Sequence, residues 1–179
     1  MNYIVFDLEL NSKPFKSRHP NEIIEIGAVK LNKDLEITDT FQSFVKPKVY
    51  KKLFKVIKLK TDIKQEDVND AEDFKSVLSR FREWIGRDYV LCSWGNDDIH
   101  HMRSNCRLNR IGTKWIKKCF DIQKHFSKVY SLPQGQVSSL KDALQTLDIN
   151  VDSKLHRAEA DAKYTAGVFI RIFNESDLI

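Results

Sequence analysis

Three segments with the pattern of β-strands follow one another in the N-terminal quarter of the chain, and they constrain the fold most. Tyr3–Leu10 begins as an apolar run and then alternates, Glu22–Leu31 is mostly apolar, and Ile37–Val45 carries two phenylalanines. Runs of this length and composition predict strands. Only polar connections separate them, the first interrupted by Pro14 and Pro20, so we expect an antiparallel meander.

The rest of the chain mixes helical and strand patterns. Asp73–Ile85 places its apolar residues at the spacing of an amphipathic helix, which Gly86 ends, and Tyr89–Ser93 has the pattern of a buried strand. Ser138 or Ser139 is a candidate N-cap for a later helix. The mixture indicates one α/β domain over residues 1–179. Further helices are expected over Asp98 to about Leu108, Leu140–Leu147 and Ala158–Phe173, with a short strand over Lys114–Asp121.

The charge of the chain favours an anionic partner. The net charge is +5, and eight lysines lie within residues 46–64 among scattered apolar residues. Part of this lysine-rich segment is expected to form a basic amphipathic helix. Two interpretations stay open for it: a solvated surface, or a flank that contacts phosphate groups.

The cysteines and the apolar segments indicate the compartment. Cys92, Cys106 and Cys119 are odd in number and form no CxxC pair, which favours reduced thiols in a cytoplasmic protein and gives no reason to expect a zinc site. The N-terminus has no signal-peptide pattern, and no apolar run is long enough to span a bilayer, so no membrane partner is expected.

Asp7 and Glu9 form the first candidate site. Residues i and i+2 of a strand point to the same face, and the intervening Phe6, Leu8 and Leu10 are apolar. Two carboxylates held together on a covered strand repel unless a cation neutralises them. Oxygen ligands suit Mg²⁺ or Mn²⁺. The alternative is an edge strand whose polar positions are simply solvated.

Asp97 and Asp98 follow the buried strand through Gly95 and begin a helix. Carboxylates are favoured at that position by the helix dipole, so either residue alone is also explained as an N-cap. His100 and His101 lie on the same helix, but adjacent residues face different directions and do not form a chelating pair.

His156 precedes the last expected helix, and Asp161 lies within its first turns. Asp161 can project to the side of the loop that carries His156. A histidine is a plausible general base near neutral pH. In isolation, a capping or surface cluster is the favoured explanation of the pair.

Taken together, the three motifs resemble the DEDDh group of the DnaQ-like exonuclease superfamily: Asp-x-Glu, then Gly-x-x-Asp after a strand, then His-x-x-x-x-Asp entering a C-terminal helix. The resemblance covers essentially the whole chain. Ser93-Trp94-Gly95 and the segment from Leu59 to Val68 are similar to the branch containing KapD and the eukaryotic 3′ exonucleases of histone messenger RNA. The resemblance to the DEDDh group implies an RNase H-like mixed five-stranded sheet, with three antiparallel strands followed by parallel strands, flanked by helices.

The resemblance also implies roles for single residues. Asp7, Glu9, Asp98 and Asp161 would hold two Mg²⁺ or Mn²⁺ ions, and His156 would be the general base. Asp98 is preferred over Asp97 because the family spacing is Gly-x-x-Asp. Candidate substrate contacts are Leu8, Leu10 and Asn11, the last standing where the family often has threonine, with Phe15 and Trp94 as aromatic candidates for base stacking, although core packing is favoured for Trp94.

The expected activity is removal of nucleoside 5′-monophosphates from a single-stranded 3′ end of nucleic acid, with RNA favoured over DNA. Three alternatives remain: a non-catalytic nucleic-acid-binding module on the same fold, a dinucleotide-degrading phosphodiesterase, and a polymerase proofreading subunit. The clustered acids argue against a pure binder, because negative charge beside a phosphate weakens binding unless a cation intervenes. The sequence leaves the oligomeric state open.

Overall fold

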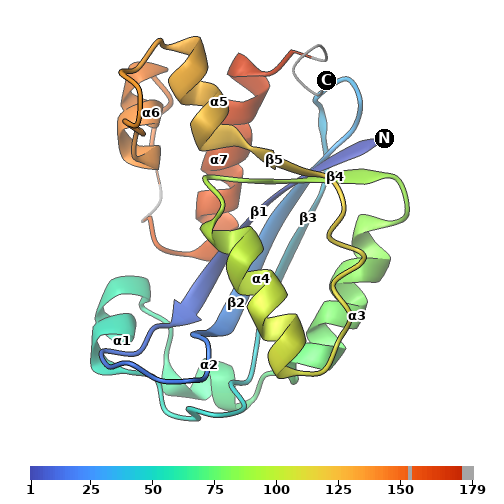
Figure 1. Ribbon diagram of the computed structural model, residues 1–179, viewed down its shortest axis with the longest axis vertical. Helices are drawn as coiled ribbons and strands as arrows, with labels where there is room; N and C mark the ends of the chain where they lie inside the picture. The colour runs from blue at the N-terminus through green and yellow to red at the C-terminus, as the bar shows by residue number, and fades with distance from the viewer. Residues whose placement is uncertain (153–154, 175–179) are drawn as a thin grey trace.

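The computed structural model describes residues 1–152 and 155–174, and it is built around one twisted five-stranded sheet (Figure 1). The strand order is β3-β2-β1-β4-β5. The strands are β1 (Asn2–Asn11), β2 (Glu22–Leu31), β3 (Ile37–Phe44), β4 (Tyr89–Ser93) and β5 (Cys119–Asp121).

The first three strands form the predicted antiparallel meander. Within it, Asp7 lies opposite Gly27 and Glu9 lies opposite Glu25 on the neighbouring strand β2. Strand β4 then pairs parallel with β1, and β5 pairs parallel with β4. The predicted change from antiparallel to parallel pairing is therefore confirmed, and it makes β1 the central strand.

Helices cover both faces of the sheet (Figure 1). On one face, the apolar sides of α3 and α4 bury Ile4, Phe6 and Leu8 of β1. On the other face, α5, α6 and α7 pack over Tyr3 and Val5, because successive strand residues point to opposite faces. The helices are α1 (Lys55–Thr61), α2 (Gln65–Asn69), α3 (Phe74–Ile85), α4 (Asp97–Leu108), α5 (Ile122–Val129), α6 (Leu140–Thr146) and α7 (Ala158–Ile172).

Most expected elements are confirmed, and the differences have local causes. The expected strand within Lys114–Asp121 begins only at Cys119, so the prediction over residues 114–118 is wrong. Helices α2 and α5 were not expected, because each is short and follows directly on another pattern. Asp121 ends β5 and caps α5 by accepting a hydrogen bond from the Lys124 amide. Ser139, rather than Ser138, caps α6.

The lysine-rich segment is pinned to the sheet by buried polar side chains. Glu22 accepts hydrogen bonds from the backbone amides of Lys48, Val49 and Tyr50 at 2.6–3.1 Å. Asn11 donates to two carbonyls of this segment, those of Tyr50 and Lys52, and accepts from the amide of Phe54. The segment therefore has a defined backbone course, although α1 is its only helix. Within the described parts of the chain, no helix is both long and apolar enough to cross a membrane.

Candidate active site

Strand β1 presents Asp7 and Glu9 on the sheet face that α7 covers. They continue the row of Tyr3 and Val5, which pack under the helices of that face. Glu9 is buried at 7% exposure, and Asp7 is partly buried. The alternative of a solvated edge strand is wrong, because β1 lies at the centre of the sheet.

Asp98 joins these two carboxylates from the beginning of α4. Since β4 runs parallel to β1, the turn after β4 delivers the start of α4 to the end of β1 where the acids lie. Asp98 is partly buried and lies near the backbone of Leu8, which opposes the rise of its pKa, whereas Asp97 is exposed. The geometry therefore brings Asp98, and not Asp97, into the cluster.

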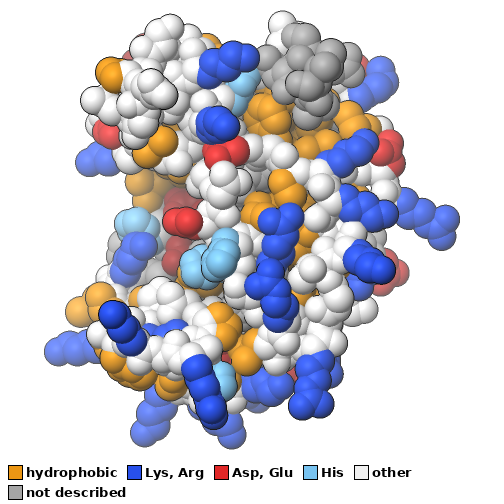
Figure 2. Space-filling model, viewed as in Figure 1, with side chains coloured by type: hydrophobic (Ala, Val, Ile, Leu, Met, Phe, Trp, Pro, Cys, Tyr) orange, Lys and Arg blue, Asp and Glu red, His pale blue; other side chains and the backbone are white. Residues whose placement is uncertain are grey.

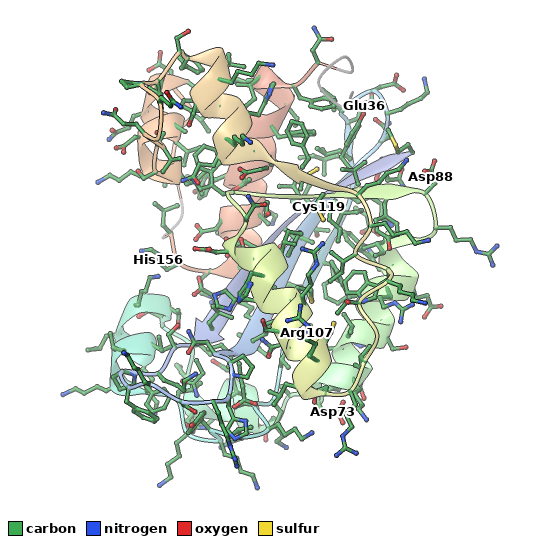
Figure 3. The ribbon with its side chains drawn as sticks, viewed as in Figure 1. Glu36, Asp73, Asp88, Arg107, Cys119 and His156 are labelled. Carbon is green, nitrogen blue, oxygen red and sulfur yellow. The ribbon has the colours of Figure 1, made fainter. Side chains whose placement is uncertain are left out.

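Helix α7 supplies the fourth acid, and the loop that precedes it supplies the histidine. Asp161 is 8% exposed, and its Oδ2 accepts a hydrogen bond of 3.0 Å from the backbone amide of His156. His156 has a positive φ of 75°, an uncommon backbone conformation for a residue with a side chain. Ligand atoms of Glu9, His156 and Asp161 lie within 4.8 Å of one another. His156 lies on the loop that enters α7, facing α1 (Figure 3).

Glu25 and Arg157 fix the entrance of α7, and sequence reasoning missed both. The fully buried Glu25 carboxylate accepts hydrogen bonds from the Arg157 guanidinium at 2.9 and 3.2 Å and from the Ala158 amide at 3.2 Å. This ion pair compensates the cost of burying the charge. The Glu25 carboxylate also satisfies a backbone N–H in the first turn of α7, that of Ala158. The N-cap residue Arg157 makes no side-chain hydrogen bond to this turn.

Gly27 allows α7 to approach β2 closely. A Cβ atom at this position would fall well inside van der Waals distance of the backbone of Ala158 and Glu159. Glycine within a strand often marks such a close backbone approach. The signal was present in the sequence, as a glycine inside the apolar run of β2, but the partner helix begins 131 residues later.

The four carboxyl groups disfavour ionisation in one another. Burial, followed by the charges of Asp98, Asp161 and Glu9, raises the pKa of Asp7 well above its usual value. Burial raises the pKa of Glu9 to about 7, although the charge of Lys60 on α1 opposes the shift, and burial together with Glu9 raises the pKa of Asp98 to about 8. Burial also raises the pKa of Asp161, and its buried Oδ1 has no hydrogen-bond partner among the described residues. An oxygen-rich site of this kind suits a divalent cation.

We expect the stability of the metal-free protein to fall as the pH rises from about 5 to about 8.5. Unfolded carboxyl groups have pKa values of about 4, so between these and the raised folded values near 7 and 8 the folded state binds more protons. The measurement is the melting temperature in EDTA across that range. Adding Mn²⁺ should raise it most at high pH, because carboxylate ligands bind metals only when deprotonated. A melting temperature in EDTA that rises over this range would contradict the raised pKa values.

The candidate substrate contacts are placed differently from the acids. Leu8 is buried in the core beneath α3 and α4, and Leu10 packs against the same core on the opposite sheet face from Asp7 and Glu9. Asn11 is 1% exposed, with its amide committed to the lysine-rich segment. Their role in substrate binding stays a prediction, and Leu8 and Asn11 would have to act through their backbone.

The two aromatic candidates also differ. Trp94 packs against Phe126 under the helices, which fits the favoured role in the core, and its buried indole N–H has no partner within residues 1–152 and 155–174. Phe15 is 51% exposed on the loop after β1, where it makes edge contacts of 5.8 Å with Tyr50 and Phe54. Phe15 is therefore the more exposed of the two rings.

The site opens to solvent. Figure 2 shows acidic side chains within a hollow at the left of the molecule, flanked by histidine and by lysine or arginine side chains. The hollow lies between the α7 side and the lysine-rich segment with α1 (Figures 1 and 2). A ligand that reaches the acids therefore passes a basic rim.

Comparison with known proteins agrees with this geometry. The RNase_T family model, described as exonuclease, matches residues 4–169. The 3′-5′ exoribonuclease 1 of Rattus norvegicus is 32% identical over 167 residues, covering 87% of this chain and 48% of that protein. The probable 3′-5′ exonuclease KapD of Bacillus subtilis strain 168 is 32% identical over 112 residues, covering 60% of this chain and 54% of that protein.

A solved structure extends the agreement to the fold. The nuclease domain of 3′hExo, described as a DEDDh family member bound to rAMP, has a TM-score of 0.86 and 28% identity, covering 95% of this chain and 90% of that one. This likeness confirms the expected RNase H-like fold. The chain spans about half the length of the curated relatives it matches.

Proposed function

This chain belongs to the exonuclease family of DEDDh type, and on that premise we propose that it removes nucleoside 5′-monophosphates stepwise from single-stranded 3′ ends of nucleic acid, RNA in preference to DNA. The observation that carries the proposal is the convergence of four acids and a histidine from three distant segments. Asp7 and Glu9 come from β1, Asp98 from α4, and His156 with Asp161 from the entrance of α7.

The acids are arranged to hold cations rather than to act as nucleophiles. Asp7, Glu9, Asp98 and Asp161 would bind two Mg²⁺ or Mn²⁺ ions, which when bound supply charge neutralisation for the phosphate and a water molecule of lowered pKa. The unpartnered Oδ1 of Asp161 and the raised pKa values of the cluster support this assignment. Phosphoryl transfer chiefly requires positioning and charge stabilisation, so a site made of acids suffices.

His156 would take the proton of the attacking water. Its ring lies within 4.8 Å of the Glu9 and Asp161 ligand atoms, yet the side chain is exposed enough to exchange that proton with solvent. The Asp161 hydrogen bond to its backbone amide and the neighbouring Arg157–Glu25 ion pair hold the loop in place. The contacts of Asp161 and of Arg157 thus both fix the backbone that carries the His156 side chain.

Replacing the base gives the first test of the mechanism. We expect His156→Ala to lower the cleavage rate by about 10²- to 10⁴-fold, the usual contribution of a general base, while Mn²⁺ binding by calorimetry is retained. The matched control is His100→Ala, because His100 is an exposed histidine on α4. If the pH–rate profile of the His156 variant keeps the shape of the wild-type profile, His156 is not the base.

The substrate preference rests on the relatives. One is named an exoribonuclease, and the solved nuclease domain binds rAMP, which supports RNA. The experiment uses matched RNA and DNA oligonucleotides, single- and double-stranded, with Mg²⁺ or Mn²⁺, and identifies the released product. We expect 5′-monophosphates from single-stranded RNA; faster cleavage of DNA would overturn the preference, and release of 3′-monophosphates would overturn the reaction.

A further inference from the structure

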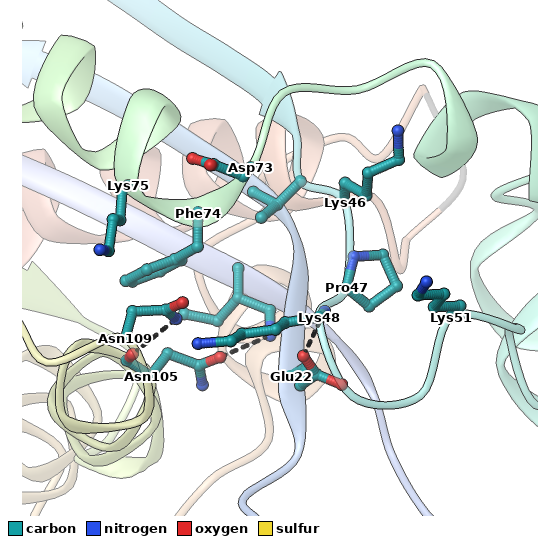
Figure 4. Close-up of a pocket in the computed structure, with 12 residues that line it drawn as sticks. Glu22, Lys46, Pro47, Lys48, Lys51, Asp73, Phe74, Lys75, Asn105 and Asn109 are labelled. Carbon is teal, nitrogen blue, oxygen red and sulfur yellow. Dashed lines mark hydrogen bonds between the residues drawn. The ribbon is translucent and has the colours of Figure 1, made fainter.

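A basic pocket lies on the sheet face opposite the acids. Its volume is about 370 Å³, and it is bounded by the beginning of β2, the segment after β3, the start of α3 and the end of α4 (Figure 4). Four lysines line it, Lys46, Lys48, Lys51 and Lys75. It shares no lining residue with the acid cluster.

The pocket lysines are not held by hydrogen bonds or ion pairs with the described residues, although the charge of Lys75 acts on Asp73. Among residues 1–152 and 155–174, none of the four ammonium groups makes a hydrogen bond or an ion pair. Figure 4 shows Lys48 extending across the pocket toward Asn105 and Asn109, with Lys75 on one side and Lys46 and Lys51 on the other. Lysine side chains therefore lie on both sides of the pocket, with Lys48 across it.

The two acids of the pocket are already engaged. Glu22 is 3% exposed, and its carboxylate accepts hydrogen bonds from three backbone amides of the lysine-rich segment. Asp73 caps α3 by accepting a hydrogen bond from the Ser76 amide, which lowers the pKa of Asp73. Within the described residues neither acid forms an ion pair with a lysine, and four lysines against two acids leave the pocket with an excess of positive charge.

The wall of the pocket is rigid. Asn105, 2% exposed, accepts a hydrogen bond from the Ile23 amide and donates to the Asn21 carbonyl, tying α4 to the beginning of β2. Since Glu22 also fixes the backbone at Lys48, the lysine Cα atoms are held before any ligand binds. Preorganisation of this kind lowers the ordering cost of binding.

We propose that this pocket binds the phosphate backbone of the same nucleic-acid strand, several nucleotides upstream of the 3′ end. The inference rests on the proposed function, which places that 3′ end at the acids. The route between the two sites crosses the loop of residues 12–21, whose Lys13, Lys16 and Arg18 are basic and whose Phe15 is exposed. Lysine binds phosphate as a mobile point charge and does not select a base, so the site would recognise chain length rather than sequence.

The test compares two triple variants with the wild-type protein. One replaces Lys46, Lys48 and Lys75 with glutamine, and the control replaces Lys114, Lys118 and Lys141, which are exposed and lie outside the pocket. Binding of unstructured RNA of four and twenty nucleotides is measured by fluorescence anisotropy in EDTA, across a salt series. Both variants remove the same charge, and EDTA prevents cleavage.

We expect the pocket variant to bind the twenty-mer about 10-fold more weakly or worse, with a salt slope smaller by about 2, since each phosphate contact on a single strand contributes about 0.7. Its affinity for the four-mer should stay within about twofold, as should both affinities of the control. An equal loss for both lengths, an equal loss in the control, or no loss would each overturn the proposal.

Two further measurements separate this inference from the proposed function. Acetylation of Lys48 in the wild-type protein, read by mass spectrometry, should be slowed by the twenty-mer and not by the four-mer; equal rates would overturn the pocket. Cleavage of the four-mer with Mg²⁺ tests the exonuclease alone. Failure of that cleavage would reject the activity, while the metal-free binding difference would still stand or fall by itself.

Discussion

Asp7→Asn is expected to lower the rate of 3′-end cleavage by about 10²- to 10³-fold, while raising the melting temperature of the metal-free protein. The rate falls because the variant loses a carboxylate that would hold the cations, and these neutralise the transferring phosphate; loss of one such stabilising interaction costs about 10²- to 10³-fold. The stability rises because burial and three neighbouring carboxylates penalise the Asp7 charge when no cation is present. Cleavage of a labelled oligonucleotide and melting in EDTA measure the two effects.

The adjacent acid on α4 provides the control. Asp97 is exposed and lies next to Asp98, so Asp97→Asn removes the same charge near the site without removing a clustered carboxylate. We expect its cleavage rate to stay within a few-fold of wild type and its metal-free melting temperature to change little. Equal effects of the two substitutions would show that general charge, and not the cluster, controls both properties.

Gly27→Ala is expected to reduce activity by about 10²-fold and to destabilise the fold by about 1–3 kcal/mol. The added methyl group would overlap the backbone at Ala158 and Glu159, so the start of α7 has to move away from β2. Asp161 and His156 then leave the acids on β1, and a displacement of about 1 Å at a reacting centre costs about 10²-fold. Chemical denaturation and steady-state cleavage measure the two losses.

Gly112→Ala is the matched control for this substitution. Nothing lies within 4 Å of a Cβ atom at Gly112, and its φ is not in the left-handed region, so the same chemical change meets open space. We expect wild-type activity and equal or slightly higher stability. If Gly27→Ala behaves in the same way, the close approach of α7 to β2 does not position the catalytic residues.

The sequence predicted those parts of the site that depend on local periodicity. Alternation in β1 placed Asp7 and Glu9 on one face, and the motif order brought in Asp98, His156 and Asp161. Local pattern left the choice between Asp97 and Asp98 to the family spacing, because both begin the same helix. The contact of Asp98 with the Leu8 backbone, a contact between distant segments, distinguishes them.

The parts that escaped prediction are long-range. Glu25 and Arg157 are 132 residues apart in the sequence, and the local sequence around each residue does not predict that they pair. The expected strand over residues 114–118 failed because apolar residues such as Trp115 are buried without pairing to the sheet. Alternation in β1 also indicated that Leu8 faces away from the acids, a consequence that the resemblance to relatives obscured.

The attachment of residues 48–54 to β1 and β2 has a consequence for how the chain unfolds. The acceptors, Glu22 and Asn11, sit on strands, while the amides that they hold come after the whole meander has been threaded. If these bonds broke while the sheet stayed intact, the Glu22 carboxylate would remain buried without hydrogen-bond donors, which is costly. Residues 48–54 should therefore unfold cooperatively with strands β1–β3 as one unit. They should not unfold independently like an ordinary surface loop.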